Sequence, residues 1–150
     1  MILQKSEKNA EKRSHGGTGK IDKNLTENKL SSCIIDAAIE VHTVLGGPGL
    51  LESVYEIALA EELQRRSIPF QRQLVVPVNY KGKIIGEAFR LDLIVDNTVI
   101  VEVKATEQLH NVHSAQVLTY LRLTQKKLGL VLNFGQPLLR DGICRVVNNF

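Results

Sequence analysis

Apolar residues recur at three-to-four-residue spacing over residues 30–45, and this is the period of one face of an α-helix. The run Gly46-Gly47-Pro48-Gly49 ends that pattern, because glycine and proline interrupt helices. A second helical pattern covers about residues 50–66, and a third covers about residues 114–126. We therefore predict three helices.

Short runs rich in Val and Ile lie between and after the last two helices, and such runs are typical of β-strands. Pro77 lies in the first run and indicates an edge strand or a bulge. The predicted order α-α-β-β-β-α-β-β is that of one α/β domain, a three-layer fold with helices flanking a central mixed sheet. The predicted strands cover about residues 73–80, 84–95, 99–105, 129–134 and 143–147.

The first 28 residues contain only six apolar residues, too few to form a core, so we predict a disordered tail over 1–28 and a folded domain over 29–150. The chain has neither an apolar signal-peptide region nor a run long enough to cross a membrane, which predicts a soluble, cytoplasmic protein. Cys33 and Cys144 form no metal-binding or redox motif, and we interpret both as small hydrophobic residues in a reducing compartment.

The net charge of +3 is unevenly distributed along the chain. Residues 1–28 carry a net +2, and the remaining residues carry thirteen Lys/Arg against twelve Asp/Glu. Bulk charge therefore does not predict strong nonspecific binding of the folded part to nucleic acid, and any such binding must come from a local patch.

The best candidate for a functional site is the strand-like run over residues 99–104, Val-Ile-Val-Glu-Val-Lys. Side chains alternate along a strand, so Glu102 and Lys104 share one face. Charged residues are seldom buried unless they are paired. An ion pair on an exposed sheet face is the alternative interpretation.

The position of Asp92 favours a functional site over a surface ion pair. It lies among large apolar residues, and a three-residue loop over 96–98 would pair Val95 with Val99 and place Asp92 opposite Glu102. Two carboxylates that close repel one another unless one is protonated or a cation lies between them. A site of this kind suits a hard ion such as Mg²⁺, and with Lys104 beside it the site could hydrolyse a phosphodiester.

Two polar pairs on the predicted helices are further candidates. Glu52 and Tyr55 are three residues apart, and Gln116 and Tyr120 are four apart, so each pair shares a helix face. Either pair could equally be a solvated face with a packed tyrosine. His42 could be a hydrogen-bonded core residue, and the sequence leaves its role and those of Tyr55 and His113 open.

Taken together, these residues resemble a known family. The stretch EVHTVLGGPGLLESVYE over residues 40–56 resembles the signature of the GxxExxY proteins, small bacterial proteins of the PD-(D/E)XK nuclease superfamily. The segments RLD at 90–92, EVKA at 102–105, HSAQVLTYL at 113–121 and GLVLNFG at 129–135 match in the same order. The resemblance covers roughly residues 25–150. It implies a restriction-endonuclease-like αβββαβ core and a Mg²⁺-dependent nuclease, with Mn²⁺ as the alternative ion and DNA expected over RNA.

The resemblance also implies roles for single residues. Asp92 matches the metal-binding acid, and Glu102 and Lys104 match the (D/E)XK pair. Glu52 matches a helix-borne acid, and a Gln-x-x-x-Tyr element of the exonuclease-like branches corresponds to Gln116 and Tyr120. Leu91 stands where the superfamily has proline, which is a departure from the pattern.

Three other functions fit the same residues. The chain could be a catalytically silent nucleic-acid-binding module, a phosphohydrolase of small molecules, or a protein-interaction domain that keeps the nuclease fold. The intact set of Asp92, Glu102 and Lys104 favours an enzyme. The sequence determines neither endo nor exo cleavage nor the oligomeric state.

Overall fold

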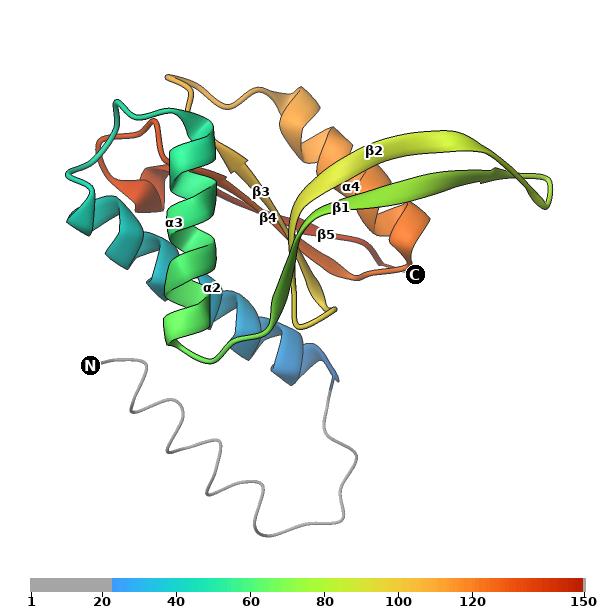
Figure 1. Ribbon diagram of the computed structural model, residues 1–150, viewed down its shortest axis with the longest axis horizontal. Coiled ribbons are helices and arrows are strands. Elements are labelled where there is room, and N and C mark those ends of the chain that lie inside the picture. The colour runs from blue at the N-terminus through green and yellow to red at the C-terminus, as the bar shows by residue number, and fades with distance from the viewer. Residues whose placement is uncertain (1–22, 150) are drawn as a thin grey trace, which may run out of the picture.

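The computed structural model describes residues 23–149, and its elements follow the predicted order (Figure 1). Three α-helices and a five-stranded mixed sheet form the predicted three-layer α/β fold. No helix in the described range is long and apolar enough to cross a membrane. The elements are α2 (Lys23–Val44), α3 (Glu52–Arg65), β1 (Phe70–Tyr80), β2 (Lys83–Val95), β3 (Val99–Lys104), α4 (Asn111–Thr124), β4 (Leu128–Asn133), the 3-10 turn η1 (Leu139–Gly142) and β5 (Ile143–Val147).

The first helix begins earlier than the sequence pattern predicted. Residues 23–28, which we assigned to the tail, are the first turns of α2. Hydrogen bonds fix this end of the helix, because Arg145 of β5 donates to the side chains of Asn28 and Ser31. The apolar pattern does not extend over these turns, because polar contacts hold this end of the helix. The rest of the predicted tail lies outside the described residues.

The sheet has the strand order β1-β2-β3-β4-β5. Neighbouring strands are antiparallel except β3 and β4, which are parallel and are joined by α4. A parallel pair needs such a crossover. Pro77 lies on β1, the edge strand, where a missing backbone donor is tolerated. The register of β1 against β2 shifts beside Pro77, so both predicted features are present.

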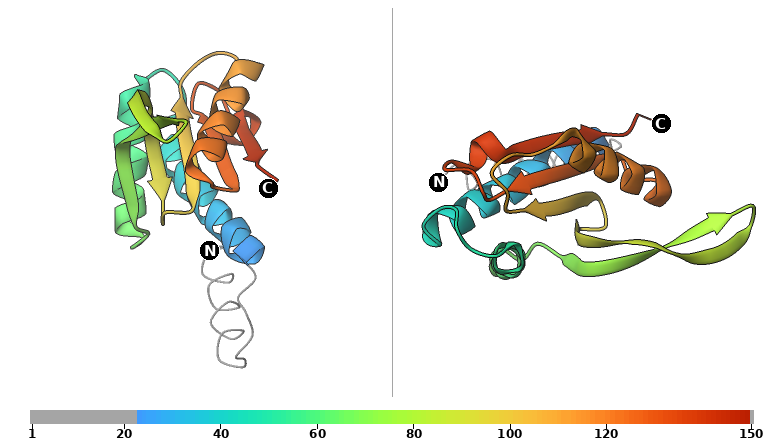
Figure 2. Two further views of the ribbon diagram at one scale, coloured as in Figure 1. Left: turned by 90° about the vertical axis from the view of Figure 1, so that its right-hand side faces the viewer. Right: turned by 90° about the horizontal axis from the view of Figure 1, so that it is seen from above.

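Side-chain alternation along β3 divides the core into two clusters. Val101 and Val103 pack with α2 and α3 on one face of the sheet, while Ile100 packs with Val117 of α4 on the other. Figure 2 shows α4 and the pair α2 and α3 on opposite sides of the strands. Glu102, two residues after Ile100, therefore belongs to the face that α4 covers.

Helix α4 approaches the sheet closely at Gly129 of β4. A Cβ atom on Gly129 would lie 2.5 Å from Cγ1 of Val117 and 3.5 Å from Cδ1 of Leu121. Only a residue without a side chain permits this approach. Gly129 therefore sets how closely α4 packs against the face of the sheet that carries Glu102.

The hairpin of β1 and β2 extends beyond the sheet as a long ribbon (Figures 1 and 2). Strand β2 pairs with β3 only over Leu93–Val95, so the preceding part of the hairpin pairs only with itself. We call residues 74–91 the arm. Its base packs under α4 through Phe89, whose ring stacks on Tyr120 with centroids 3.9 Å apart. Residues 79–88 are all exposed.

Candidate active site

The loop between β2 and β3 aligns two acidic residues. Val95 pairs with Val99, and the predicted three-residue loop joins them. Asp96 and Asn97 adopt left-handed conformations with φ of 49° and 50°, which Asp and Asn tolerate better than most residues. Extending the register by one pair beyond Leu93 and Val101 places Asp92 opposite Glu102, as the sequence predicted.

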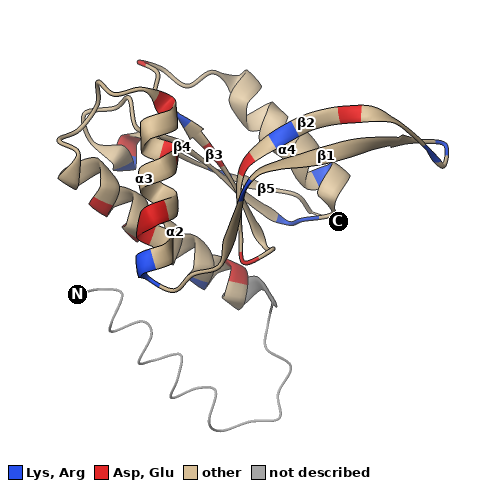
Figure 3. Ribbon diagram, in the orientation of Figure 1, with Lys and Arg blue, Asp and Glu red and all other residues tan. Residues whose placement is uncertain are grey.

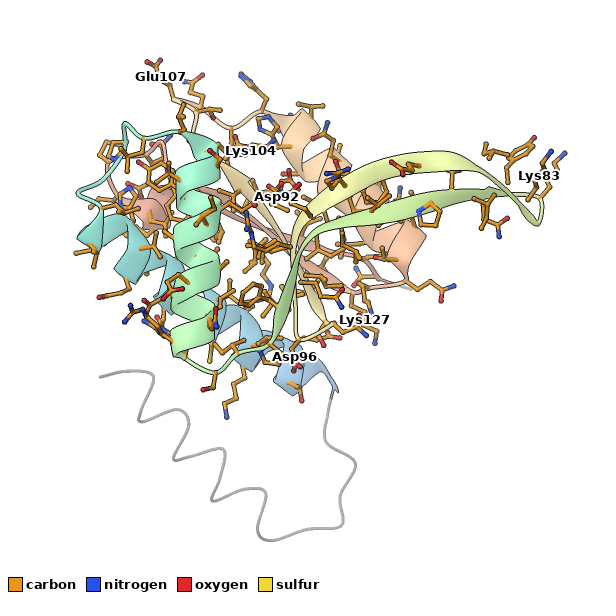
Figure 4. The ribbon with its side chains drawn as sticks, in the orientation of Figure 1. Lys83, Asp92, Asp96, Lys104, Glu107 and Lys127 are labelled. Atoms are coloured by element: carbon orange, nitrogen blue, oxygen red, sulfur yellow. The ribbon has the colours of Figure 1, made fainter. Side chains whose placement is uncertain are left out.

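Asp92 is labelled on β2 in Figure 4, and the register places its carboxyl group on the same face of the sheet as that of Glu102. Oδ2 of Asp92 accepts a hydrogen bond of 2.9 Å from the backbone N–H of Val103. Oε1 of Glu102 lies 3.7 Å from Nζ of Lys104. Oε2 of Glu102 is buried without a hydrogen-bond partner among the described residues. The described residues therefore provide a partner for only one of the two carboxyl oxygens of Glu102.

Burial changes the acidity of both groups. The pKa of Glu102 rises from 4.5 to about 8, chiefly because the group loses solvent and then because of the charge of Asp92, while Lys104 opposes the rise. Burial likewise raises the pKa of Asp92 from 3.8 to about 6, although the hydrogen bond from Val103 opposes this.

A third acid, Glu56 of α3, lies against Asp92. It is only 6% exposed, and its charge contributes to the raised pKa of Asp92. Arg72 donates to it at 2.6 Å, and the Gln73 amide donates to its two oxygens at 2.7 and 2.9 Å. Gln73 adopts a left-handed conformation with φ of 52° in the middle of β1. Such strain often occurs beside functional sites.

Glu52, the acid that the resemblance favoured, lies one helical turn before Glu56. It is the first residue of α3 and is exposed. Its charge still affects the site, because it contributes to the raised pKa of Glu102. No sequence pattern favours Glu56 over Glu52, because the contacts that distinguish Glu56 come from β1, sixteen or more residues away.

Two of the predicted site residues, Tyr120 and Gln116, lie on α4 and differ in burial. Tyr120 is partly buried, and burial together with the charges of Glu102 and Asp92 raises its pKa. Gln116 is exposed one turn earlier and makes no side-chain hydrogen bond within the described part of the chain. His113 lies near the site as well, since burial and the charge of Lys104 lower its pKa, and its Nδ1 accepts a bond of 3.3 Å from the backbone of His110.

Two residues of the 40–56 signature have structural contacts. Tyr55 is fully buried, and its hydroxyl donates to the Gly47 carbonyl at 2.7 Å and accepts from the Leu50 N–H at 3.2 Å. Its ring stacks on Phe134 with centroids 4.7 Å apart. His42 is 6% exposed, and its Nε2 lies 2.9 Å from the Gln136 carbonyl. Both residues therefore fix the glycine-rich loop and the core beneath it.

The end of β3 is held by a side chain from the neighbouring strand. The Asn133 amide accepts from the backbone N–H groups of Thr106 and Gly135, both at 3.0 Å, and donates to the Thr106 carbonyl at 2.9 Å. The backbone N–H of Phe134 donates to the carbonyl of Lys104 at 2.8 Å. This Asn133 clamp fixes the backbone from which Lys104 extends.

The donor set at this site is small. Among residues 23–149, no three His, Cys, Asp or Glu side chains are placed to hold a metal ion by themselves. Asp92 and Glu102 could supply two oxygen ligands to a hard ion, with waters or substrate oxygens completing its shell. Lys104 adds one positive charge on the same side.

Comparison with known proteins gives one match. A model of the PD-(D/E)XK nuclease superfamily matches residues 28–146, which include every site residue described above. Neither the curated proteins nor the solved structures contain a significant match to this chain.

Proposed function

The chain belongs to the PD-(D/E)XK nuclease superfamily, and from that premise we propose that it is a divalent-metal-dependent nuclease that hydrolyses phosphodiester bonds, with DNA as the preferred substrate. The observation that carries the proposal is the grouping of Asp92, Glu102 and Lys104 at one end of β3, with two acids whose pKa values are raised.

The residues fit a divalent ion. Oε2 of Glu102 is buried without a partner among residues 23–149, and the charge of Asp92 acts on the same group, so a bound cation would compensate both acids. We propose Mg²⁺, with Mn²⁺ as a substitute, because Mg²⁺ is commonly bound by one or two carboxylates plus substrate phosphates. A bound ion of this kind lowers the pKa of a water and neutralises charge on the phosphate.

The chain's own groups would then have separate roles. Asp92 and Glu102 hold the ion, and the backbone N–H of Val103 keeps Asp92 in position. The Lys104 ammonium stabilises negative charge that grows on the phosphate during attack by water. We assign substrate positioning to Tyr120, and to Gln116, which is exposed on the same helix and free to reach a bound strand.

We further propose that the chain is a GxxExxY protein, on the strength of the 40–56 signature. Within that signature Glu52 is exposed and affects Glu102 by its charge, so we assign it a contact with substrate or with a water of the metal shell. The contacts of Tyr55 support a structural role for that part of the signature.

A cleavage assay tests the proposal. Labelled single- and double-stranded DNA and RNA are incubated with the protein in Mg²⁺, Mn²⁺ or EDTA. We expect cleavage that EDTA abolishes and that falls at least a hundredfold in Glu102→Gln and Lys104→Ala. Glu61→Gln is the matched control, because Glu61 is an exposed acid paired only with Arg65 of its own helix. Metal-independent binding without cleavage would instead identify a silent binding module.

A further inference from the structure

The arm over residues 74–91 is a charged structure, and nothing in the part of the chain that the structure describes covers its outer part. Residues 79–88 are exposed on both strands, and the turn Lys81-Gly82 at its tip is a two-residue turn with φ of 50° and 84°. Such turns match the twist of a hairpin and let it extend without support. Lys83 projects at the far end in Figure 4.

Positive charge is concentrated on the arm. Its charged residues are Lys81, Lys83 and Arg90 against the single acid Glu87. The rest of the described chain holds eleven Lys/Arg against twelve Asp/Glu. Figure 3 shows the cationic tip well separated from the acids of α2 and α3. The arm is therefore the local basic patch that an almost neutral domain needs in order to bind a polyanion.

Exposed apolar side chains accompany these cations. Tyr80 is 58% exposed, and Ile84 and Ile85 are 67% and 60% exposed. Nζ of Lys81 lies 5.3 Å from the centroid of the Tyr80 ring. On a duplex, cations of this kind contact phosphates, and exposed apolar side chains beside them can pack in a groove.

The arm also starts at the candidate active site. Arg90 is two residues from Asp92, and the stacking of Phe89 on Tyr120 fixes the direction in which the arm leaves the domain. Asp92 lies nine positions after Lys83, which corresponds to about 30 Å of strand. One turn of duplex DNA is about 34 Å long.

We propose that the arm holds the sugar-phosphate backbone of a duplex about one helical turn away from the bond that is cut, with Lys81 and Lys83 on the phosphates and Tyr80 against the groove. This inference rests on the proposed nuclease function and adds a docking surface to it. It explains how a domain with little excess charge can retain a substrate.

Fluorescence anisotropy with a labelled duplex of about 24 base pairs in EDTA tests the docking surface, with salt varied from 50 to 200 mM. We expect Lys81→Ala/Lys83→Ala to weaken binding about tenfold and to reduce the slope of log K against log salt by about 2, since each phosphate contact contributes about 0.9. The control is Lys126→Ala/Lys127→Ala, which removes the same charge directly before β4 and should leave the slope unchanged. Figure 4 shows Lys127 away from Lys83 at the tip of the arm.

Duplex length provides a second readout. Wild type should bind the 24-base-pair duplex far more tightly than one of about 8 base pairs, which cannot span site and tip together, and the arm variant should lose most of that preference. Equal slopes for wild type and the arm variant would overturn the docking surface while leaving the nuclease proposal intact. Equal losses in the control variant would overturn it too, as a general charge effect.

Two further outcomes separate the two proposals. Failure of wild type to bind or cut any nucleic acid would overturn both. Sedimentation of wild type and the arm variant tests the other occupant of an exposed hairpin, a second copy of the chain. A dimer that the arm substitutions abolish, with DNA binding unchanged, would show that the arm is a dimerisation element and not a nucleic-acid contact.

Discussion

Replacing Glu102 with glutamine should change how the free energy of unfolding depends on pH. In the unfolded chain the pKa of Glu102 is near 4.5, whereas in the fold it is about 8. A raised pKa means that the native state binds the proton more tightly, so this contribution to stability is complete below about pH 4.5 and is lost as pH rises to 8. Glutamine keeps the shape of the side chain but cannot titrate.

The expected size follows from the same two values. Each pH unit between the two pKa values corresponds to about 1.4 kcal/mol, so between pH 5 and pH 8 the wild type should lose on the order of 3 kcal/mol through Glu102. Asp92 adds a smaller loss of the same sign between about pH 4 and pH 6, since its pKa is also raised. The Glu102→Gln protein should retain only that smaller loss.

Urea denaturation in EDTA at several values of pH between 5 and 9 measures this difference. The chain has no tryptophan, so far-UV circular dichroism is the suitable signal. Histidines titrate in the same range, but their contribution cancels in the difference between the two proteins. Glu61→Gln, at an exposed ion pair, should follow the wild type. Parallel curves for wild type and Glu102→Gln between pH 6 and pH 8 would refute the raised pKa of Glu102.

Three further predictions concern single residues. Asp92→Asn should raise the metal-free melting temperature near pH 7, because it removes a buried charge that also lies beside Glu56. It should abolish stabilisation by Mg²⁺, and an Mg²⁺ response equal to wild type would remove Asp92 from the metal site. Tyr55→Phe should cost about 2 kcal/mol in urea denaturation, because the carbonyl of Gly47 and the N–H of Leu50 lose their partner; an unchanged midpoint would contradict the structural role. Gly129→Ala should destabilise the fold by about 1–3 kcal/mol through its contact with Val117, and Val117→Ala should relieve part of that cost in the double variant.

The periodic parts of the fold were predictable from the sequence. Strand alternation and an odd loop length were enough to place Asp92 opposite Glu102, because a shift of one residue would have moved one of them to the other face. The first turns of α2 were missed because polar contacts to Arg145 hold them and no apolar stripe marks them.

Contacts between distant segments were not predictable in the same way. Glu56 and Glu52 occupy the same helix, and only the docking of α3 beside β1 decides which of them Arg72 and Gln73 reach. The left-handed conformation of Gln73 has no sequence signal, since glutamine carries no turn preference. Local patterns thus located the strand that bears the site, and tertiary packing selected the acids around it.

The Asn133 clamp has a consequence for local stability. Strand ends usually fray, and amide protons there exchange quickly with solvent. Here the side-chain amide of Asn133 continues the hydrogen bonding of the parallel pair beyond the last residues of β3 and β4. The amide protons of Thr106 and Gly135, although they lie in loops, should therefore exchange as slowly as those of the central strands. The end of β3 that carries Lys104 would then open only when the whole sheet opens, and the backbone of Lys104 would stay in place while its side chain changes rotamer.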